Sequence, residues 1–244
     1  MRRQVTVAGA HGLVVGLSGG VDSAVVARLC QMATRGDVLG VLLPCQSDPQ
    51  DEMDARLVAQ HFSLPVTLVS LDSAYEALMR ATDARAGGRF ADTPPIVPPD
   101  ANTRAAAGNL KARLRMAALY FLANSLNYLV AGTGNRSEIE IGYYTKYGDG
   151  GVDMLPLGNL LKAQVYHLAR ELDIPVPIID KVPTAGLWPD QTDEGEIGFT
   201  YRQLETYLDE GPEAISPALA LRIDRLMRAS EHKRTMPPSP AVAS

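Results

Sequence analysis

One short segment combines the residue types that bind phosphate: two serines, two adjacent glycines and an aspartate. It comprises Gly16, Leu17, Ser18, Gly19, Gly20, Val21, Asp22 and Ser23. An apolar run ends here and apolar residues recur at helical spacing afterwards, so the segment is predicted to join a buried strand to a helix. Backbone N–H groups and the positive end of the helix dipole would then favour an anion. Because glycines allow close backbone approach and serines add hydroxyl donors, the expected anion is a pyrophosphate.

The same segment also admits a simpler interpretation, an ordinary turn in which Asp22 or Ser23 caps the helix. No lysine follows the glycines as in a Walker sequence, and their spacing is not that of the dinucleotide fingerprint G-x-G-x-x-G. The pattern S-G-G-x-D-S after a first buried strand resembles the signature of the ATP pyrophosphatases of the adenine-nucleotide α-hydrolase class. That resemblance implies cleavage of ATP to AMP and pyrophosphate.

Within that class, the chain resembles the NAD synthetase family from about Ala8 to Pro237. Further blocks carry the resemblance in the family's order: G-N-L-K-A-R at 108–113, G-T-G-N-R-S-E at 132–138, T-K-Y-G-D-G-G-V-D at 145–153, P-T-A-G-L-W at 183–188 and E-H-K-R at 231–234. The resemblance implies an ammonia-dependent ligase that amidates deamido-NAD through an acyl-adenylate, giving NAD, AMP and pyrophosphate in the last step of NAD biosynthesis. It also implies ATP as co-substrate and Mg²⁺ as cofactor.

Glu138 is a second acidic residue whose position supports a role in this chemistry. Thr133 and Glu138 follow the predicted strand 128–132, so they are expected at the carboxyl edge of the sheet, where open parallel sheets bind ligands. Glu138 together with Asp22 would give two oxygen ligands for magnesium bridging ATP phosphates. A solvated surface glutamate is the simpler alternative. The catalytic set implied by the resemblance is Asp22, Glu138 and Lys162.

The resemblance also implies which residues contact each substrate. Those expected at ATP are the segment 16–23, Thr133, Lys162 and Thr184. Those expected at deamido-NAD are Arg113, Lys146, Asp153, His232 and Lys233. Simpler roles stay open: a solvated lysine for Lys162, a plain salt bridge for Arg113, and a frayed terminus for the tail residues.

Arg113 lies on a long predicted helix that runs from about residue 102 to residue 126. Successive residues of an α-helix turn by about 100°, which predicts an apolar stripe along one side. The stripe comprises Leu110, Leu114, Ala117 and Phe121. Lys111 and Arg115 are predicted to point well away from it, with Arg113 at its edge. An arginine at that edge suits a site beside packed surface.

Strands and helices are predicted to alternate along much of the chain. The predicted strands are 12–17, 38–43, 66–71 and 128–132, and the helices include 49–61, 102–126, 160–172 and 217–230. This alternation is typical of an α/β fold with a doubly wound, Rossmann-like parallel sheet and helices on both faces. Two stretches, about 84–100 and 183–198, are predicted to be flexible loops that act as lids.

Composition favours one domain over residues 1–244, with a tail from about 231 to 244. The chain is 46% hydrophobic and 21% charged, which allows a buried core. A net charge of -5 argues against a nucleic-acid partner. No apolar run approaches the roughly 18 to 20 residues that span a bilayer, and no signal peptide is evident. Cys30 and Cys45 lack zinc-site spacing, which favours a reducing, cytoplasmic compartment.

The nitrogen donor and the oligomeric state are expectations taken from the family. Its glutamine-using members carry a separate amidase domain, and nothing before Ser18 could hold one, so free ammonia is the expected donor. A separate glutaminase subunit stays open. The family is typically a symmetric homodimer with the deamido-NAD site near the interface, and two-fold symmetry is the commonest oligomeric arrangement.

Other functions share the S-G-G-x-D-S core. A tRNA-thiolating enzyme usually has paired cysteines and a basic face, both missing here. A GMP synthetase subunit offers no explanation for the blocks at 145–153 and 231–234. A nucleotide-binding or regulatory module without catalysis would have no need of intact residues for catalysis and ATP phosphate. The residues that the resemblance implies for these roles are Asp22, Glu138, Lys162 and Thr184.

Overall fold

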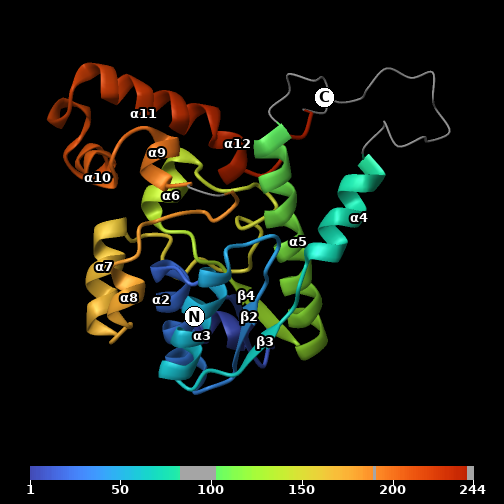
Figure 1. Cartoon of the computed structure of the whole chain (residues 1–244). Helices are drawn as coiled ribbons and strands as arrows, with labels where there is room; N and C mark the ends of the chain where they lie inside the picture. The colour runs from blue at the N-terminus through green and yellow to red at the C-terminus, as the bar shows by residue number, and fades with distance from the viewer. Residues whose placement is uncertain (83–102, 189–190, 241–244) are drawn as a thin grey trace, which may run out of the picture.

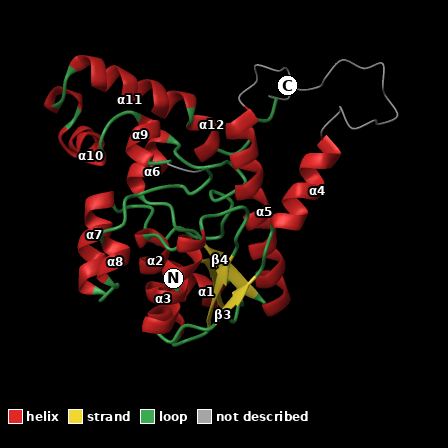
Figure 2. Cartoon of the chain, viewed as in Figure 1, coloured by secondary structure: helices red, strands yellow, loops and turns green. Residues whose placement is uncertain are grey.

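A parallel sheet lies at the centre of the computed structural model, which describes residues 1–82, 103–188 and 191–240 (Figure 1, Figure 2). Its four strands have the order β3-β2-β1-β4. They are β1 (Gly12–Gly16), β2 (Val38–Leu42), β3 (Val66–Leu68) and β4 (Tyr128–Ala131). Within β1, Val14 pairs with Leu39 on one side and Val130 on the other. Because both faces of β1 are buried, its sequence is a nearly continuous apolar run.

Helices cover both faces of the sheet. The first face carries α2 (Val21–Thr34), α3 (Pro49–His61), α7 (Lys162–Glu171) and α8 (Val176–Ile179), together with α1 (Arg2–Val7), packed with Leu13 and Val15 of β1. The second face carries α4 (Asp72–Thr82) and α5 (Thr103–Leu126), packed with Val14. Successive side chains of a strand point to opposite faces, so these two clusters are the two sides of one sheet. The predicted fold class, a doubly wound parallel sheet with helices on both faces, is confirmed.

The strand order reverses beside β1. The chain passes from β1 through α2 to β2 and through α3 to β3, and then crosses by α4 and α5 to β4 on the other side of β1. Doubly wound sheets bind ligands at such a reversal, beyond the carboxyl ends of the strands. The segments that leave these two strand ends, 17–20 and 132–135, therefore define the expected site.

A group of shorter helices lies beyond one end of the sheet (Figure 1). It comprises α6 (Arg136–Ile141), α9 (Asp193–Ile197), α10 (Tyr201–Glu210), the 3₁₀ helix η1 (Pro212–Ala214), α11 (Pro217–Ala229) and α12 (Glu231–Arg234). Ile141, Leu204 and Ile223 are buried in a small core to which α6, α10 and α11 contribute. α6 follows β4 closely in the chain, and α12 is attached to it because the Arg234 guanidinium donates to the Ile139 and Glu140 carbonyl oxygens.

β1, β2 and β4 each end one residue before the predicted boundary, and two stretches differ by more. β3 ends at Leu68 rather than at residue 71, because it is a short edge strand whose side chains are only partly covered. The stretch 183–198 contains α9, which was not predicted, and Thr192 begins this helix by accepting a hydrogen bond from the Gly195 N–H. The predicted loop 84–100 lies outside the described residues.

The predicted stripe on α5 is partly wrong. Leu110 and Leu114 pack against the second face, but Phe121 is 72% exposed and Lys111 is buried. The buried side of α5 instead follows small residues such as Gly108, where a Cβ atom would lie 3.0 Å from the side chain of Leu187. The absence of a side chain at Gly108 lets Leu187 pack closely against the backbone of α5. The spacing of large apolar residues alone therefore does not identify the buried side of this helix.

Both cysteines are buried and free. Burial raises the pKa of the Cys30 thiol to about 12, so Cys30 behaves as an apolar packing residue. Among the helices in the described part of the chain, none has the length and apolarity needed to cross a membrane.

Candidate active site

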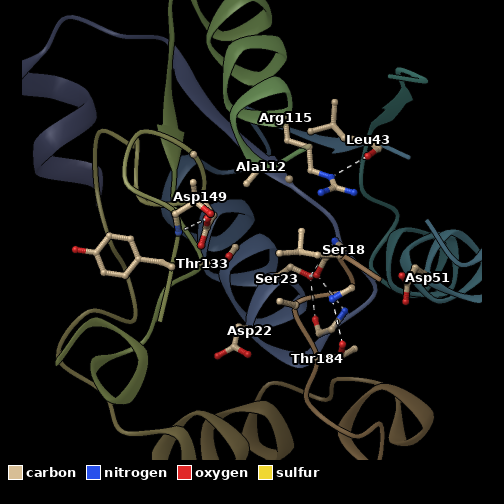
Figure 3. Close-up of a pocket in the computed structure, with 18 of the residues that line it drawn as sticks. Ser18, Asp22, Ser23, Leu43, Asp51, Ala112, Arg115, Thr133, Asp149 and Thr184 are labelled. Atoms are coloured by element: carbon tan, nitrogen blue, oxygen red, sulfur yellow. Dashed lines mark hydrogen bonds between the residues drawn. The ribbon is translucent and has the colours of Figure 1, made fainter. Parts of the chain in front are cut away.

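The glycine loop after β1 is held in a defined shape by its two serines. Ser23 Oγ accepts from the Ser18 N–H at 3.2 Å and from the Ser18 hydroxyl at 3.1 Å, and donates to the Gly20 carbonyl at 2.9 Å. Gly20 is the N-cap residue of α2 and has no side-chain cap, so the loop leaves the first helical N–H groups without a capping side chain. Figure 3 shows Ser18, Ser23 and Thr184 grouped near this loop. The arrangement fits an anion at the helix start.

Gly19→Ala is expected to reduce the free energy of unfolding by about 3 kcal/mol. Gly19 has a φ of +78°, and a Cβ atom there would lie 2.5 Å from the Asp51 carbonyl oxygen of α3. Chemical denaturation measures the effect. Gly20→Ala is the matched control, because its Cβ atom would meet only Ser18 Oγ at 3.4 Å. Equal stability of the two variants would contradict the tight packing of the loop on α3.

Three charged side chains meet beside the glycine loop. Lys162 Nζ lies 2.5 Å from Asp22 Oδ2 and 3.3 Å from Glu138 Oε1. Asp22 comes from the first turn of α2, Glu138 from α6 after β4, and Lys162 from the first residue of α7. Asn135 connects them, because its side-chain amide donates to Asp22 Oδ1 at 2.9 Å while its Oδ1 accepts from the Glu138 N–H. The reversal of strand order thus brings together three residues that are far apart in sequence.

Burial sets the electrostatics of this cluster. The side chain of Lys162 is 4% exposed, against 17% for Asp22 and 16% for Glu138. Burial raises the pKa of Glu138, Lys162 lowers it and Asp22 raises it, with a result of about 7. Burial alone would lower the pKa of Lys162, but the two carboxylates outweigh it, so its pKa is raised. Lys162 therefore stays an ammonium at neutral pH.

A cavity of about 640 Å³ opens over the loop and the charged cluster. The residues predicted for ATP that line it are Gly16, Leu17, Ser18, Gly20, Val21, Asp22, Ser23, Thr133, Lys162 and Thr184. Glu138, predicted as a catalytic residue and metal ligand, lines it as well. Gly19 packs against α3 behind the loop. Glycine N–H groups, hydroxyls and one ammonium on one wall are the groups that bind polyphosphates. The geometry suits a nucleotide whose phosphates lie on the glycine loop.

Comparison with known proteins agrees with this geometry. The family model described as NAD synthase matches residues 1–237. The chain belongs to the NAD synthase family. It is 48% identical to an NH(3)-dependent NAD(+) synthetase of Carboxydothermus hydrogenoformans, covering 99% of this chain and 94% of the relative.

Solved structures extend the comparison. An NMN synthetase from Francisella tularensis has a TM-score of 0.87 at 37% identity, over 99% of this chain and 94% of that one. An NH3-dependent NAD synthetase from Campylobacter jejuni has a TM-score of 0.76 at 29% identity, over 98% and 93% of the two chains. ATP as a co-substrate is consistent with membership of this family.

The residues that the family resemblance implies at deamido-NAD are placed differently from the ATP set. Lys233 lines the cavity, with its ammonium 2.6 Å from the carbonyl oxygens of Gly142 and Tyr144. Arg113, Lys146, Asp153 and His232 do not line it.

Three of these outer residues form a contiguous group. The Arg113 guanidinium lies 3.4 Å from the Lys146 carbonyl oxygen, and Lys146 Nζ donates to the His232 carbonyl oxygen. Asp153 is separate from this group, and its carboxylate accepts from the Val130 N–H and from the Tyr120 hydroxyl. The structure thus brings the tail beside the block 145–153.

Several residues that line the cavity or support it were not predicted. Arg115, predicted to point away from the apolar stripe, lines the cavity and donates to the Leu43 carbonyl oxygen at 3.1 Å (Figure 3). The predicted stripe gave no sign that the side of α5 carrying Arg115 faces a cavity. Asn135 carries a readable signal, since Asn-x-x-Glu before a helix is a capping box. Tyr201 has none: its hydroxyl lies 2.8 Å from Asp193 and 3.3 Å from Glu138 only through tertiary packing.

Proposed function

We propose that this chain makes NAD by amidating deamido-NAD with ammonia and ATP, releasing AMP and pyrophosphate. The observation that carries the proposal is the meeting of Asp22, Glu138 and Lys162 beside a glycine loop on the wall of one cavity. The named activity of close family members supports it. A free carboxylate is a poor electrophile, so the reaction needs a site that activates it with a nucleotide, and this cavity has the groups for that task.

The chemistry follows in two steps. A carboxylate oxygen of the substrate attacks the α-phosphorus of ATP, and the bond to pyrophosphate breaks. Ammonia then attacks the acyl carbon, loses a proton, and AMP leaves with that carboxylate oxygen. Lys162, the N–H groups of the glycine loop and the hydroxyls of Ser18 and Thr184 would bind the departing pyrophosphate. Positioning and electrostatics supply the rate enhancement in this scheme, so a nucleophilic side chain is unnecessary.

The acidic pair fits the predicted Mg²⁺. Because one ammonium lies within 3.3 Å of both carboxylates, Asp22 and Glu138 are near enough to each other that both would hold one Mg²⁺ ion. The described residues contain no group of three or more His, Cys, Asp or Glu side chains that could hold a metal by themselves. Mg²⁺ typically uses one or two carboxylates and completes its shell with phosphates and water. When bound, the ion would neutralise charge on the phosphates.

Arg113, Lys146, Asp153, His232 and Lys233 remain the proposed contacts for deamido-NAD. We also propose a homodimer, because four of these five residues lie outside the ATP cavity and a partner chain could complete a site for the rest of the dinucleotide. A mass in solution twice that of the chain would support this arrangement. The free, buried cysteines are consistent with a cytoplasmic location.

Purified protein is expected to form NAD from deamido-NAD, ATP and ammonium, and to release one AMP and one pyrophosphate for each NAD formed. Chromatography of the nucleotides measures NAD and AMP, and a pyrophosphate-release assay measures the third product. Replacing ammonium with glutamine is the matched test of the nitrogen donor, and we expect no product from the pure chain. ADP in place of AMP would contradict the proposal.

A second candidate substrate is the corresponding mononucleotide acid, which would give NMN by the same chemistry. It is favoured by one observation, the TM-score of 0.87 to a protein titled as an NMN synthetase. Supplying both acids at equal concentration to the same enzyme distinguishes the two. More NAD than NMN supports the dinucleotide, and the reverse result assigns the mononucleotide.

A further inference from the structure

Lys181 is a charged residue beside the cavity that the proposed reaction does not use. It follows α8 and begins the segment that carries Thr184. Its ammonium lies 2.8 Å from Asp51 Oδ1 and 2.5 Å from Asp54 Oδ2, both on α3. The three side chains are only 22%, 22% and 12% exposed. An ion pair with two partners and this degree of burial holds its geometry better than a surface pair does.

The same turn of α3 supports the glycine loop from behind. A Cβ atom on Gly19 would lie 2.5 Å from the Asp51 carbonyl oxygen and 2.9 Å from Asp54 Cβ. Gly186 also faces this turn, since a Cβ atom there would lie 3.4 Å from Asp51 Oδ2. The first turns of α3 therefore contact both the glycine loop and the segment that carries Thr184.

The far end of that segment is held by a different lysine. Lys111 of α5 donates to the Leu187 carbonyl oxygen at 3.2 Å, and Gly108 leaves room for the Leu187 side chain. Thr184 lies between the two attachment points, and its hydroxyl accepts from the Gly186 N–H at 3.0 Å. Lys181 thus fixes the near end and Lys111 the far end.

We propose that Lys181 is a positioning residue which, through Asp51 and Asp54, holds Thr184 and the glycine loop in register for the phosphates of ATP. Both Lys181 and Asp51 line the cavity, whereas Asp54 does not. A positioning role makes Lys181 and Asp54 act as one unit. The inference rests on the proposed use of ATP.

A double-mutant cycle on ATP binding tests this role. Lys181→Met and Asp54→Asn are each expected to weaken ATP affinity about tenfold. The double variant is expected to lose about the same tenfold, because each single change already breaks the contact between Lys181 and Asp54. Lys181→Arg keeps the charge and is expected to stay within about threefold of the wild type. The KM for the nicotinate substrate is expected to change little. Arg56→Met, which removes an exposed pair with Glu52 on the same helix, is the matched control.

The outcomes separate the two proposals. Additive losses, near a hundredfold in the double variant, would overturn the positioning role while leaving ATP as a ligand. An unchanged ATP affinity in Asp54→Asn would also overturn the positioning role. Because Asn has the same shape as Asp, this variant still tests the role if Lys181→Met fails to fold. Failure of the wild type to bind ATP at all would overturn both the positioning role and the proposed function. ATP binding without NAD formation would overturn the proposed function alone.

Discussion

Asp22→Ala is expected to lower kcat by roughly 10³-fold or more, because it removes a predicted Mg²⁺ ligand at the phosphates. The structure adds a second reason. Asp22 Oδ2 holds Lys162 at 2.5 Å and its Oδ1 accepts from Asn135, so the alanine variant also frees two groups that would bind or orient ATP. NAD formation at saturating substrates measures the loss.

Two controls show whether this loss is chemical. Asp22→Asn keeps an oxygen for Asn135 but removes the charge, and it is expected to be nearly as inactive as alanine. Asp209→Ala removes an exposed aspartate that pairs with Arg136, and it is expected to keep wild-type activity. An Asp22→Ala enzyme with a wild-type rate would refute the metal and phosphate role of Asp22.

Lys162→Met is expected to lose about 3 kcal/mol of unfolding free energy at pH 8, together with nearly all activity. Among the described residues, Lys162 is the only cation that pairs with Asp22 and Glu138, and its removal leaves two part-buried carboxylates without a positive partner. Denaturant unfolding measures the stability. Mg²⁺ without ATP is expected to restore part of it, because a cation held by Asp22 and Glu138 would compensate the charge of the two carboxylates.

The pH dependence of this variant has a definite sign. Burial and Asp22 already raise the pKa of Glu138 against the effect of Lys162, and losing Lys162 raises it further. A carboxyl group whose pKa is raised by folding stabilises the protein while protonated, and that stabilisation is lost as pH rises through the folded pKa. The deficit of Lys162→Met relative to wild type is therefore expected to be larger at pH 8 than at pH 6. An equal deficit at both values would contradict the charge cluster.

Local signals predicted the central part of this fold and site. The strand, glycine turn and helix around residues 12–34 follow from an apolar run, the loop residues and helical spacing, and the structure has them there. Glu138 could be placed at the sheet edge because it follows a strand directly. The contact of Lys162 with both acids could not be derived locally, since it depends on how α7 packs against α2.

The long helix shows why other features escaped prediction. Its hydrophobicity is spread around the helix, so the spacing of leucines does not reveal the buried side. Gly108 and Lys111 lie on the buried side, where the segment after Thr184 packs against the helix and the Leu187 carbonyl oxygen accepts from Lys111. Arg115 enters the cavity for the same reason, whereas Arg113 is exposed. Tertiary contacts made by a loop, and not the helix pattern, decide which arginine faces the cavity.

Transfer of an oxygen isotope is the most direct test of an adenylating site. Deamido-NAD labelled with ¹⁸O in its nicotinate carboxylate is incubated with the enzyme, ATP, Mg²⁺ and ammonium, and AMP is examined by mass spectrometry. An acyl-adenylate requires one labelled oxygen to leave with AMP, so each AMP formed from fully labelled substrate is expected to carry a single ¹⁸O. Unlabelled AMP, or label in inorganic phosphate with ADP as the nucleotide product, would contradict the account.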